Sequence, residues 1–519
     1  MDFTKVKSAA IIGAGVAGLA TARTLRSEGI DCTVFERNAT IGGVWSDGYL
    51  NYGVQVPKEL YEFPEYPLPD DVPSFTPGPI FQRYLEDYTD HFAIRPLIQF
   101  NTVVESVEQL DAEAPRWRVT YTEDNKSQHQ DFDLVVVCIG LFSNTPHMPT
   151  FADQEQFRGS IIHISEMKSG AQLEGKKVAI VGFGKSATDA ALEAEHRAEE
   201  THLIARQLHW PIPRKLAGIL PFKWGLLNRL SITLVPPYKN PTSLERAVHG
   251  LGKPLVWLYW RLVEILLYFQ LGLGSQRGTR PSLVPKERIE IDAFNEAIMV
   301  VRPDFYRLVR NGRINLQLGE IAQYVPDGLQ LADGQEIEAD IVVFGTGWRS
   351  DYGFLSEELQ RRLGFADDGI YLYRQILHPE APGLVFIGHA STVSNILTYC
   401  MQARWVVALI SGQHRLPGRD AMLQEIDALK TWKRSWMPFS SARSARLIVH
   451  MQHYLDELLQ DFGANHLRKR GIWAPLMEVI APCQPNDYRA ISFGGRRAAG
   501  QYRQDDASSE STDTTDQAA

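Results

Sequence analysis

The stretch Ser8–Leu19, SAAIIGAGVAGL, joins a short apolar run directly to a glycine-rich loop and decides the fold. The loop fits the pattern G-x-G-x-x-G, with Gly13, Gly15 and Gly18 as its glycines. The first glycine allows a tight turn, the second lets the backbone approach a pyrophosphate, and the third lets a helix pack closely on the strand. The candidate cofactor-binding residues of this loop are Gly13, Ala14, Gly15, Val16, Ala17 and Gly18.

The sequence around this loop has the order strand, helix, strand. A helical stretch continues to about Ser27, and residues 31–36 (DCTVFE) have the pattern of a second strand. Glu36 ends that strand 23 residues after Gly13, where a carboxylate can accept hydrogen bonds from ribose hydroxyls. This context favours a dinucleotide site over a simple turn, with Glu36 and the following Arg37 as binding residues.

A second pair of glycines follows six residues after Glu36, in the sequence Gly42-Gly43-Val44-Trp45. Two glycines allow the backbone to lie close to a flat ligand, and Trp45 offers a stacking face. In isolation the segment would be a turn beside a core tryptophan. Its place just after the ribose-binding acid favours a contact of Gly43, Val44 and Trp45 with the cofactor.

A second strand, loop and helix begin at Lys177, where KVAIV precedes GFGKSA, a G-x-G-x-x-A loop. The strand that follows, THLIA, ends in Arg206 instead of an acid, and arginine there favours a 2′-phosphate, hence NADPH over NADH. The alternative is a solvated surface arginine and an NADH site. The candidate residues for the nicotinamide cofactor are Gly182, Gly184, Lys185, Ser186, Ala187 and Arg206.

Two such loops imply two dinucleotides, and a flavin with a nicotinamide is the economical pair, because hydride can pass from one to the other. The expected fold class is α/β, with two Rossmann-like dinucleotide-binding domains, the NADP domain inserted in the FAD domain, a helical insertion and a helical C-terminal region. The expected division is 1–160 for the first part of the FAD domain, 161–345 for the NADP domain with an insertion at about 207–300, and 346–485 for the return. Residues 486–519 are polar and expected to be disordered.

Composition removes several function classes. The net charge is −9 and no basic block is present, which argues against a nucleic-acid partner. The four cysteines form no C-x-x-C pair and no zinc spacing, so we expect reduced thiols, no metal site and no dithiol reductase. The N-terminus lacks the pattern of a signal peptide, and we expect a cytoplasmic protein.

An aromatic-rich insertion follows the second loop, and residues 254–274 (PLVWLYWRLVEILLYFQLGLG) are nearly long enough to span a membrane. Arg261 and Glu264 lie three residues apart in its middle, where they can pair on one helix face and would be costly in lipid. We therefore expect a buried or surface-docked helix and no spanning segment. Peripheral membrane contact, or a wall of an apolar substrate pocket, stays open.

The sequence resembles the flavin-containing monooxygenases and their neighbours, the Baeyer–Villiger monooxygenases, over roughly residues 8–410. The resemblance is carried by GAGVAGL, VFER, GGVW, FRGSIIH, GFGKSATD, DIVVFGTGW and HPEAPGLVFIG, in the order typical of the family. It implies FAD, NADPH and O₂, a C4a-(hydro)peroxyflavin shielded from water, and oxygenation of a small, hydrophobic, natural-product-like substrate at nitrogen or sulfur. It also implies four further positions of the FAD site: Val104, Thr346, Gly347 and Gly388.

Departures from the family pattern bear on the reaction. The family's Asn-x-Pro-Lys is Gln55-Val-Pro-Lys here, and Gln55 is the candidate catalytic residue, since its amide can contact the flavin edge. Met167 replaces the tryptophan of the Baeyer–Villiger fingerprint. The basic residue Lys168 that follows it favours the flavin-containing monooxygenase branch. His163, in the same fingerprint, is expected to be structural. A Baeyer–Villiger monooxygenase acting on a ketone stays the nearest alternative, followed by a non-oxygenating reductase or a nucleotide-binding scaffold. The oligomeric state is not predicted.

Overall fold

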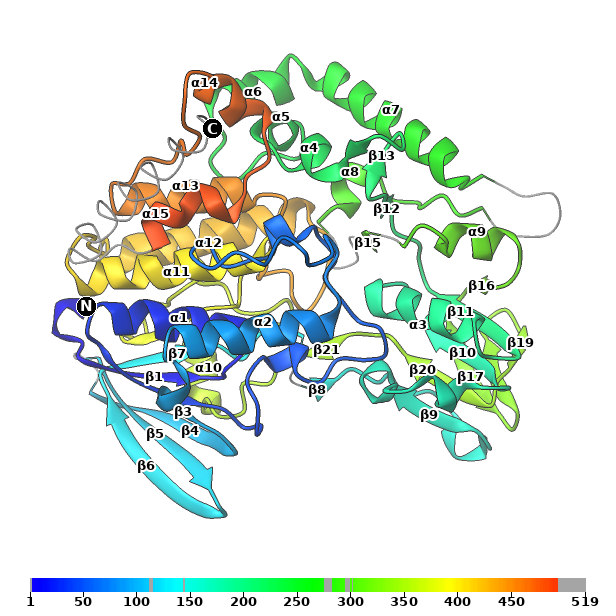
Figure 1. The fold of residues 1–519 in the computed structure, drawn as a ribbon, viewed down its shortest axis with the longest axis horizontal. Coiled ribbons are helices and arrows are strands. Elements are labelled where there is room, and N and C mark those ends of the chain that lie inside the picture. The colour runs from blue at the N-terminus through cyan, green and yellow to red at the C-terminus, as the bar shows by residue number, and fades with distance from the viewer. Residues whose placement is uncertain are drawn as a thin grey trace, which may run out of the picture.

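The computed structural model describes residues 2–111, 115–142, 145–274, 282–294, 299–300 and 302–492. Figure 1 shows two parallel sheets side by side, with a layer of helices lying above both. The predicted fold class, two Rossmann-like units with one inserted in the other and helical additions, is confirmed.

The first parallel sheet contains the apolar run that opens the chain. Its strand order is β22-β7-β1-β2-β3. The bounds are β1 Ser8–Ile12, β2 Asp31–Phe35, β3 Ile98–Gln99, β7 Leu134–Val137 and β22 Leu384–Phe386. All four residues of β7 are buried, as expected for a central parallel strand covered on both faces. Because β22 joins this sheet only after the second sheet is complete, the second unit is an insertion.

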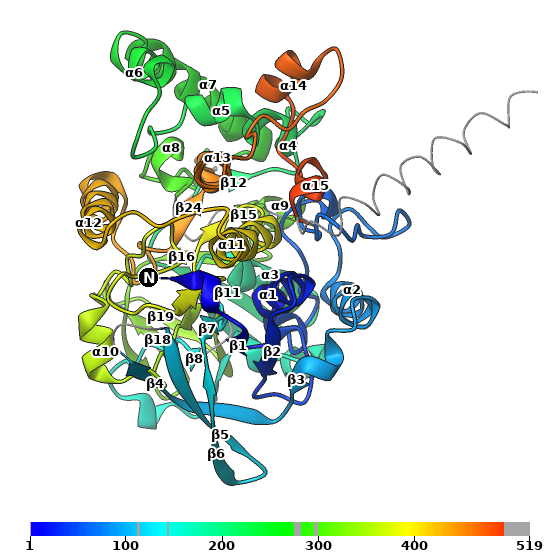
Figure 2. The same cartoon turned by 90° about the vertical axis from the view of Figure 1, so that its left-hand side faces the viewer.

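Helices and a hairpin sheet cover the first sheet. Helix α1 (Val16–Ser27) packs against α11 (Asn395–Ile410), and α2 (Gly78–His91) lies beside α1 in Figures 1 and 2. An antiparallel sheet of β4 (Thr102–Asp111), β5 (Arg116–Glu123) and β6 (Lys126–Phe132) extends from the opposite side, and α10 spans Glu357–Arg362. This sandwich leaves the carboxyl ends of the parallel strands accessible to a ligand.

The second parallel sheet has the order β16-β11-β10-β20-β9. The bounds are β9 Ser160–His163, β10 Lys177–Val181, β11 Glu200–Ala205, β16 Asn315–Leu318 and β20 Ile341–Phe344. Helix α3 (Lys185–Glu195) covers it, and β17 (Ile321–Val325), β18 (Gly328–Leu331) and β19 (Glu336–Glu338) form a small antiparallel sheet. The two crossings between the units pair with each other as β8 (Thr145–Pro146) and β21 (Trp348–Arg349). We propose domain boundaries near residues 160 and 345, close to these crossings.

The insertion after β11 is helical with short strand pairs. Its helices are α4 Phe222–Leu226, α5 Arg229–Thr233, α6 Ser243–Gly250, α7 Lys253–Leu271 and α8 Ile289–Asp292, followed by α9 Phe305–Arg310. Its short strands are β12 Pro211–Ile212, β13 Lys215–Leu216, β14 Leu220–Pro221 and β15 Met299–Val300. Arg261 and Glu264 form the predicted ion pair at 3.0 Å on α7. Within the described ranges, no helix combines the length and apolar character needed to cross a membrane.

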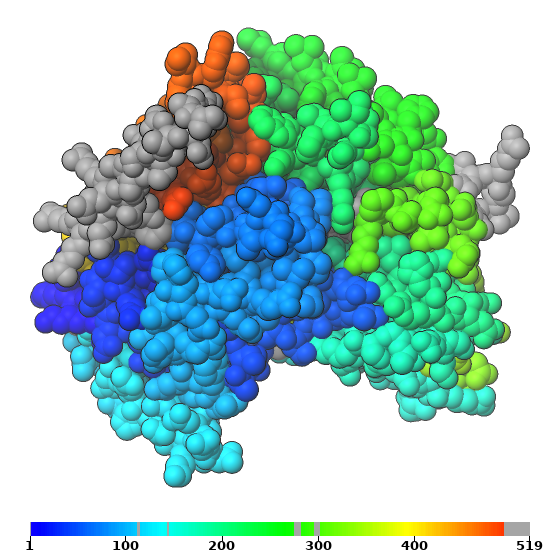
Figure 3. Space-filling model, viewed as in Figure 1, coloured from blue at the N-terminus to red at the C-terminus, as the bar shows by residue number. Residues whose placement is uncertain are grey.

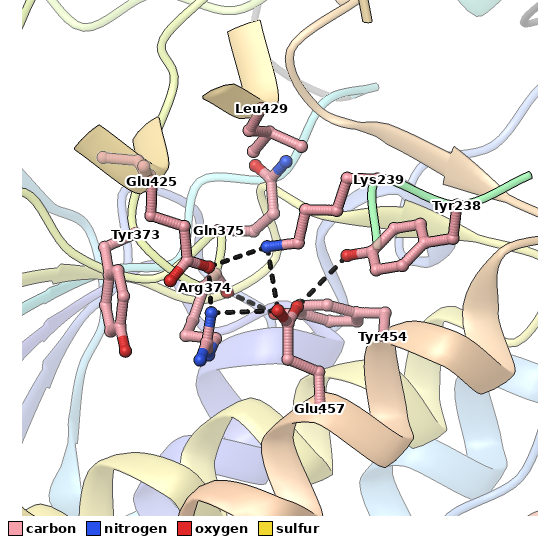
Figure 4. A pocket seen from close by; sticks show the side chains of 10 residues that line it. Tyr238, Lys239, Tyr373, Arg374, Gln375, Glu425, Leu429, Tyr454 and Glu457 are labelled. Carbon is pink, nitrogen blue, oxygen red and sulfur yellow. Dashed lines mark hydrogen bonds and ion pairs between the residues drawn. The ribbon is translucent and has the colours of Figure 1, made fainter. Parts of the chain in front are cut away.

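The C-terminal helices α12 (Arg419–Trp436), α13 (Met451–Asp461) and α14 (Ala474–Ile480) lie above the first sheet, and β23 (Ser391–Thr392) pairs with β24 (Arg446–Ile448). Figure 4 shows the ion-pair cluster that joins them to the insertion. Arg374 contacts Glu457 at 2.9 Å and also pairs with Glu425, and Lys239 from the insertion reaches the same two carboxylates at 2.8 and 2.7 Å. The cluster therefore fixes the insertion against α12 and α13.

The structure describes the chain as far as residue 492, which is within the segment 486–519 predicted to be a disordered tail. A short 3-10 helix spans Pro485–Tyr488 and α15 spans Arg489–Ser492, and Tyr488 is buried. The disordered tail stays a prediction. Residues 493–519, the rest of the predicted tail, lie outside the described residues.

Candidate active site

The first glycine loop connects β1 to α1 and is closed tightly by contacts between its own glycines. Gly13 has a φ of +104°, and its N–H donates to the Phe35 carbonyl at 2.8 Å. A Cβ on Gly18 would lie 1.9 Å from the Gly13 carbonyl oxygen, so the third position admits only glycine. Gly15 caps α1 without a side-chain hydrogen bond, which leaves the first-turn N–H groups of the helix for an anion.

Glu36 is placed beside this loop by the end of β2. Its carboxylate is buried and accepts hydrogen bonds from the Ala14 N–H at 2.8 Å and the Asn38 N–H at 2.9 Å. A carboxylate has lone pairs for further donors, so ribose hydroxyls remain compatible with these bonds. Arg37, the next residue, is exposed. Loop and acid together fit the adenosine half of a dinucleotide.

The segment Gly42–Trp45 closes over the same loop. A Cβ on Gly43 would lie 3.4 Å from the Gly15 Cα, so the two glycines are close neighbours. Val44 is exposed, whereas the Trp45 ring is buried and packs against Phe81 with 4.5 Å between ring centroids. The backbone of residues 42–44 therefore lies directly against the first glycine loop. A direct stacking contact of Trp45 with the cofactor stays a prediction.

Gly388 completes this edge of the first sheet. It follows β22 with a φ of +96°, and a Cβ there would lie 2.8 Å from the Ala17 Cβ in the first turn of α1. Its N–H donates to the Gln402 amide oxygen at 3.3 Å. Val104 lies in β4, half-buried and opposite Tyr121, two residues after the Thr102 N–H that donates to the Glu36 carbonyl. Of the predicted FAD residues, the first loop, Glu36, Gly43 and Gly388 thus lie around the start of α1, and Val104 lies on the neighbouring strand β4.

The second glycine loop connects β10 to α3. Unlike Gly15 of the first loop, which faces Gly43, its middle glycine, Gly184, faces no other segment. Gly182 has a φ of +122°, and a Cβ on Gly184 would meet no atom within 4 Å, so this turn is open on its ligand side. Lys185 and Ser186 begin α3. A Cβ on Gly345 would lie 2.7 Å from the Ala187 Cβ, so a side chain at position 345 would collide with the second loop. The alanine of the second loop already fills that space.

Arg206 stands at the end of β11, exposed to solvent. Burial lowers the pKa of nearby His147, and the positive charges of Arg349 and Arg206 lower it further. Arg206 forms no ion pair with any residue in the described part of the chain. A guanidinium left without a carboxylate at this edge fits a 2′-phosphate.

Thr346 and Gly347 lie at the crossing where the chain leaves the second sheet. The Thr346 hydroxyl donates to the His147 carbonyl, and Gly347 has a φ of +85°. A ring nitrogen of His163 bonds the Gly347 carbonyl at 3.1 Å, and its other ring nitrogen contacts Ser165. Burial lowers the pKa of His163, and both ring nitrogens have partners within the crossing. These contacts support a structural role for this histidine.

A cleft of about 560 Å³ opens between the two units. Residues 48–54, 75–77 and Pro79 of the first unit line it, together with Lys168 and Lys185 of the second. The insertion contributes Arg214, and Arg302 lies just before α9. The lining aromatic residues are Tyr49, Tyr52 and Phe75. The cleft is therefore aromatic on one side and basic on the other.

Asp189 organises the basic side of this cleft. It is buried on α3 and accepts a hydrogen bond from the Tyr49 hydroxyl at 2.8 Å, pairs with Lys185, and contacts Arg302 at 3.3 Å. Arg302 also donates to the Asn51 carbonyl at 2.7 Å. The Tyr49–Asp189 and Asn51–Arg302 hydrogen bonds join the first unit to the second and fix the walls of the cleft.

Sequence reasoning missed this network, because its members come from three distant segments, residues 49–51, residues 185–189 and Arg302. One local signal was available, since Lys185 and Asp189 have the i, i+4 spacing of a helix-surface ion pair. Arg214 gives no such signal; its guanidinium lies 3.9 Å from the centre of the Phe75 ring. Of the predicted aromatic insertion, only Arg214 reaches the cleft among the described lining residues.

Gln55, the candidate catalytic residue, is exposed and follows directly after the cleft-lining segment 48–54. Met167, which separates this chain from the Baeyer–Villiger fingerprint, is fully buried, and its carbonyl accepts from the Leu50 N–H at 2.8 Å. Lys168 donates to the Asp47 carboxylate at 2.6 Å. The fingerprint segment therefore supports the loop that leads to Gln55.

Two glycine-rich nucleotide loops on separate parallel sheets define a two-dinucleotide flavoprotein oxidoreductase. The cleft lies between the two units, and Lys185 of the second loop is part of its lining. Within the described residues, no group of three or more histidine, cysteine, aspartate or glutamate side chains has the arrangement of a metal site. The four cysteines are buried and form no disulfide. The sequence contains no C-x-x-C pair.

Comparison with known proteins identifies the family. A family model described as flavin-binding monooxygenase-like matches residues 6–245 and 295–503, and the chain belongs to that family. The enzyme is thus a flavoprotein monooxygenase, and its cofactors are FAD and NADPH. The predicted membership, enzyme class and cofactors are confirmed.

Individual relatives agree with this assignment. The probable flavin-containing monooxygenase 1 of Arabidopsis thaliana is 28% identical, over 92% of this chain and 96% of its own. Among solved structures, the S-allyl-L-cysteine S-oxygenase of Allium sativum is 20% identical with a TM-score of 0.62, covering 98% of both chains. A steroid monooxygenase bound to NADP is 19% identical with a TM-score of 0.64, covering 88% of this chain and 98% of that one. The two structures show a shared fold.

Proposed function

We propose that the enzyme transfers one oxygen atom of O₂ to the nitrogen or sulfur of a small hydrophobic substrate, while NADPH is oxidised and the second oxygen leaves as water. The observation that carries this proposal is the cleft between the two units, which is lined from both of them and includes Lys185 of the second nucleotide loop. Such a cleft can hold a nicotinamide, a flavin edge and a substrate together. The names of relatives that oxygenate sulfur support the choice of a soft nucleophile.

The residues present fit the two cofactors. The closed loop at Gly13–Gly18, the Glu36 carboxylate and the backbone of 42–44 would hold FAD, and the open second loop with Arg206 would hold NADPH. When bound, FAD accepts hydride from NADPH and supplies the reactivity toward O₂.

The chain itself contributes binding, orientation and exclusion of water. Tyr49, Tyr52 and Phe75 give the cleft an apolar side that suits an organic substrate, and Lys185 and Arg302 suit the phosphates of NADPH. Gln55 is proposed to hydrogen-bond the flavin edge from the loop after the cleft. The hydrogen bond between Tyr49 and Asp189 fixes the first unit against the second at the cleft.

A Baeyer–Villiger reaction on a ketone is the alternative, and product analysis separates the two. With NADPH and O₂, purified enzyme is expected to convert a thioether to its sulfoxide at least about tenfold faster than it converts a cyclic ketone to a lactone, a difference of about 1.4 kcal/mol in barrier. Mass spectrometry of both products in one competition reaction checks this. A lactone as the main product would establish the alternative, and NADPH oxidation without O₂ uptake would instead indicate a reductase.

A cytoplasmic location is also a proposal, as is a role in secondary metabolism. Contact of residues 254–274 with a membrane surface is a separate proposal, and it depends on the outer face of α7.

A further inference from the structure

Arg214 reaches the cleft without a partner for its charge. Its side chain is half-buried, and in the part of the chain that the structure describes its guanidinium forms no ion pair. The Nε atom is buried and has no hydrogen-bond partner among the described residues. A guanidinium withdrawn from water usually meets a carboxylate or a phosphate, because a buried charge without a partner is costly. An anion from outside the protein would therefore complete the surroundings of Arg214.

The other three cations of the cleft are matched by carboxylates of the protein. Lys168 contacts an exposed aspartate of the first unit at 2.6 Å. Lys185 and Arg302 share the buried carboxylate of Asp189, to which Arg302 lies at 3.3 Å. No aspartate or glutamate is among the described residues that line the cleft itself. The surface of the cleft is therefore positive, and the charge of Arg214 is the one that the described residues leave unmatched.

A pair of short parallel strands places Arg214 in this wall. Strand β12 pairs with β15 so that Ile212 lies opposite Val300. Arg214 and Arg302 each follow their strand by two residues, and Pro213 keeps the residue before it in extended backbone. Figure 1 shows the strand pair between the insertion helices and the second sheet, and in Figure 3 the green surface of the insertion meets the blue surface of the first unit. Backbone pairing thus fixes both arginines at the cleft.

The surroundings of the Arg214 guanidinium favour a bound anion. Burial lowers the pKa of Arg214, and the positive charge of Arg302 lowers it further. Both effects act against a cation, and an anion in the cleft would offset both. The guanidinium carbon lies 3.9 Å from the centre of the Phe75 ring. Because the N–H donors of a guanidinium lie in its plane, stacking on a ring leaves them directed sideways, where a carboxylate can accept two parallel hydrogen bonds.

The rest of the cleft suits an apolar body. Tyr49, Tyr52 and Phe75 provide aromatic surface, and the volume of about 560 Å³ is large enough for a small organic molecule. An ammonium group would meet cations and no carboxylate among the described lining residues. The cleft therefore favours a molecule with an apolar body and one negative charge over a cation.

We propose that Arg214 binds the carboxylate of the substrate, while the apolar body of the substrate lies against the aromatic side of the cleft. This inference rests on the proposed function, because it names the class of substrate for the same site: an organic carboxylate that also carries a nucleophilic sulfur or nitrogen. Arg214 is thus a specificity-determining residue that contacts the substrate away from the reacting atom. A phosphate of NADPH is the other source of an anion, and the experiment separates the two.

The test is calorimetric titration of the oxidised, flavin-loaded enzyme, with NADP⁺ present so that the cofactor's own phosphates are already bound. The two probes are (phenylthio)acetate and (phenylthio)acetamide, which share the ring and the sulfur and differ in charge. We expect the wild type to bind the carboxylate about 10- to 100-fold more tightly than the amide, the effect of a charge-assisted hydrogen-bonded pair. In Arg214→Gln this preference should fall below about threefold, whereas Arg214→Lys should keep part of it, because lysine retains the charge without the planar fork.

The matched control is Lys215→Gln, which removes a positive charge from the next residue, an exposed lysine outside the described lining of the cleft. It should keep the preference of the wild type, and melting temperatures report the folding of each variant. If Arg214→Gln does not fold, the wild-type preference and the Arg214→Lys variant still decide.

Three results would overturn the inference. The first is equal binding of the two probes by the wild type, and the second is an equal loss of preference in Arg214→Gln and Lys215→Gln. The third is weaker binding of NADP⁺ by Arg214→Gln with an unchanged preference between the probes, which would assign the arginine to a cofactor phosphate. Conversion of both probes to sulfoxides at equal kcat/KM would leave the proposed oxygenation standing while removing the carboxylate site.

Discussion

Replacing Gly15 with alanine is expected to weaken FAD binding about 10- to 100-fold while the protein remains folded. A Cβ at this position would meet only the Gly43 Cα, at 3.9 Å, so the protein itself accommodates the methyl group. The methyl would instead occupy the space through which the backbone approaches the pyrophosphate. Titration of the apoprotein with FAD, followed by flavin fluorescence, measures the change, and the melting temperature of the apoprotein reports folding.

The matched control is Gly184→Ala in the second loop, where a Cβ meets no atom within 4 Å. This variant should bind FAD normally and bind NADPH more weakly. If Gly15→Ala impaired NADPH binding and Gly184→Ala impaired FAD binding, the assignment of the two loops would be reversed. If neither variant altered binding of either cofactor, the loops would not be the nucleotide sites.

Replacing Arg206 with alanine is expected to raise the KM for NADPH about 30- to 100-fold and to change the KM for NADH less than about twofold. The expected loss is that of a charge-assisted hydrogen bond to the 2′-phosphate, about 2–3 kcal/mol, and NADH lacks that phosphate. Arg206 has no carboxylate partner in the described structure, so its removal leaves no buried charge behind. Steady-state kinetics with both cofactors measure the change.

Arg158→Ala is the control for Arg206→Ala, because Arg158 is an exposed arginine whose only described ion pair is with the equally exposed Asp327. It should leave both KM values unchanged. A similar rise for NADPH and NADH in the Arg206 variant would show that the arginine contacts a part that both cofactors share, and the preference for NADPH would then need another residue.

The sequence was sufficient for the features that local chemistry dictates. Each glycine loop requires a turn that only glycine can adopt, as the φ values of Gly13 and Gly182 show, so the strand, loop and helix could be predicted from a dozen residues. The nesting of the two units followed from the order of the apolar strands. Arg261 and Glu264 paired as predicted, because their spacing alone brings them together on a helix.

Features that arise from tertiary contacts could not be predicted. The basic wall of the cleft joins Lys168, Lys185, Arg214 and Arg302, and no sequence pattern connects residues so far apart. The packing of an apolar side chain is equally hidden in the sequence, which does not show that the Trp45 ring lies against Phe81. Helix α7 shows the opposite case. Its sequence is apolar enough for a buried helix, yet about half of its residues are exposed to solvent.

The most direct measurement of the central claim is the absorbance spectrum of the purified enzyme during anaerobic addition of NADPH. The two-cofactor site predicts a yellow protein whose flavin absorbance is bleached by one equivalent of NADPH and restored by O₂, with a thioether in the solution converted to sulfoxide. A colourless protein from a flavin-replete host, or a bound flavin that NADPH does not reduce, would contradict it.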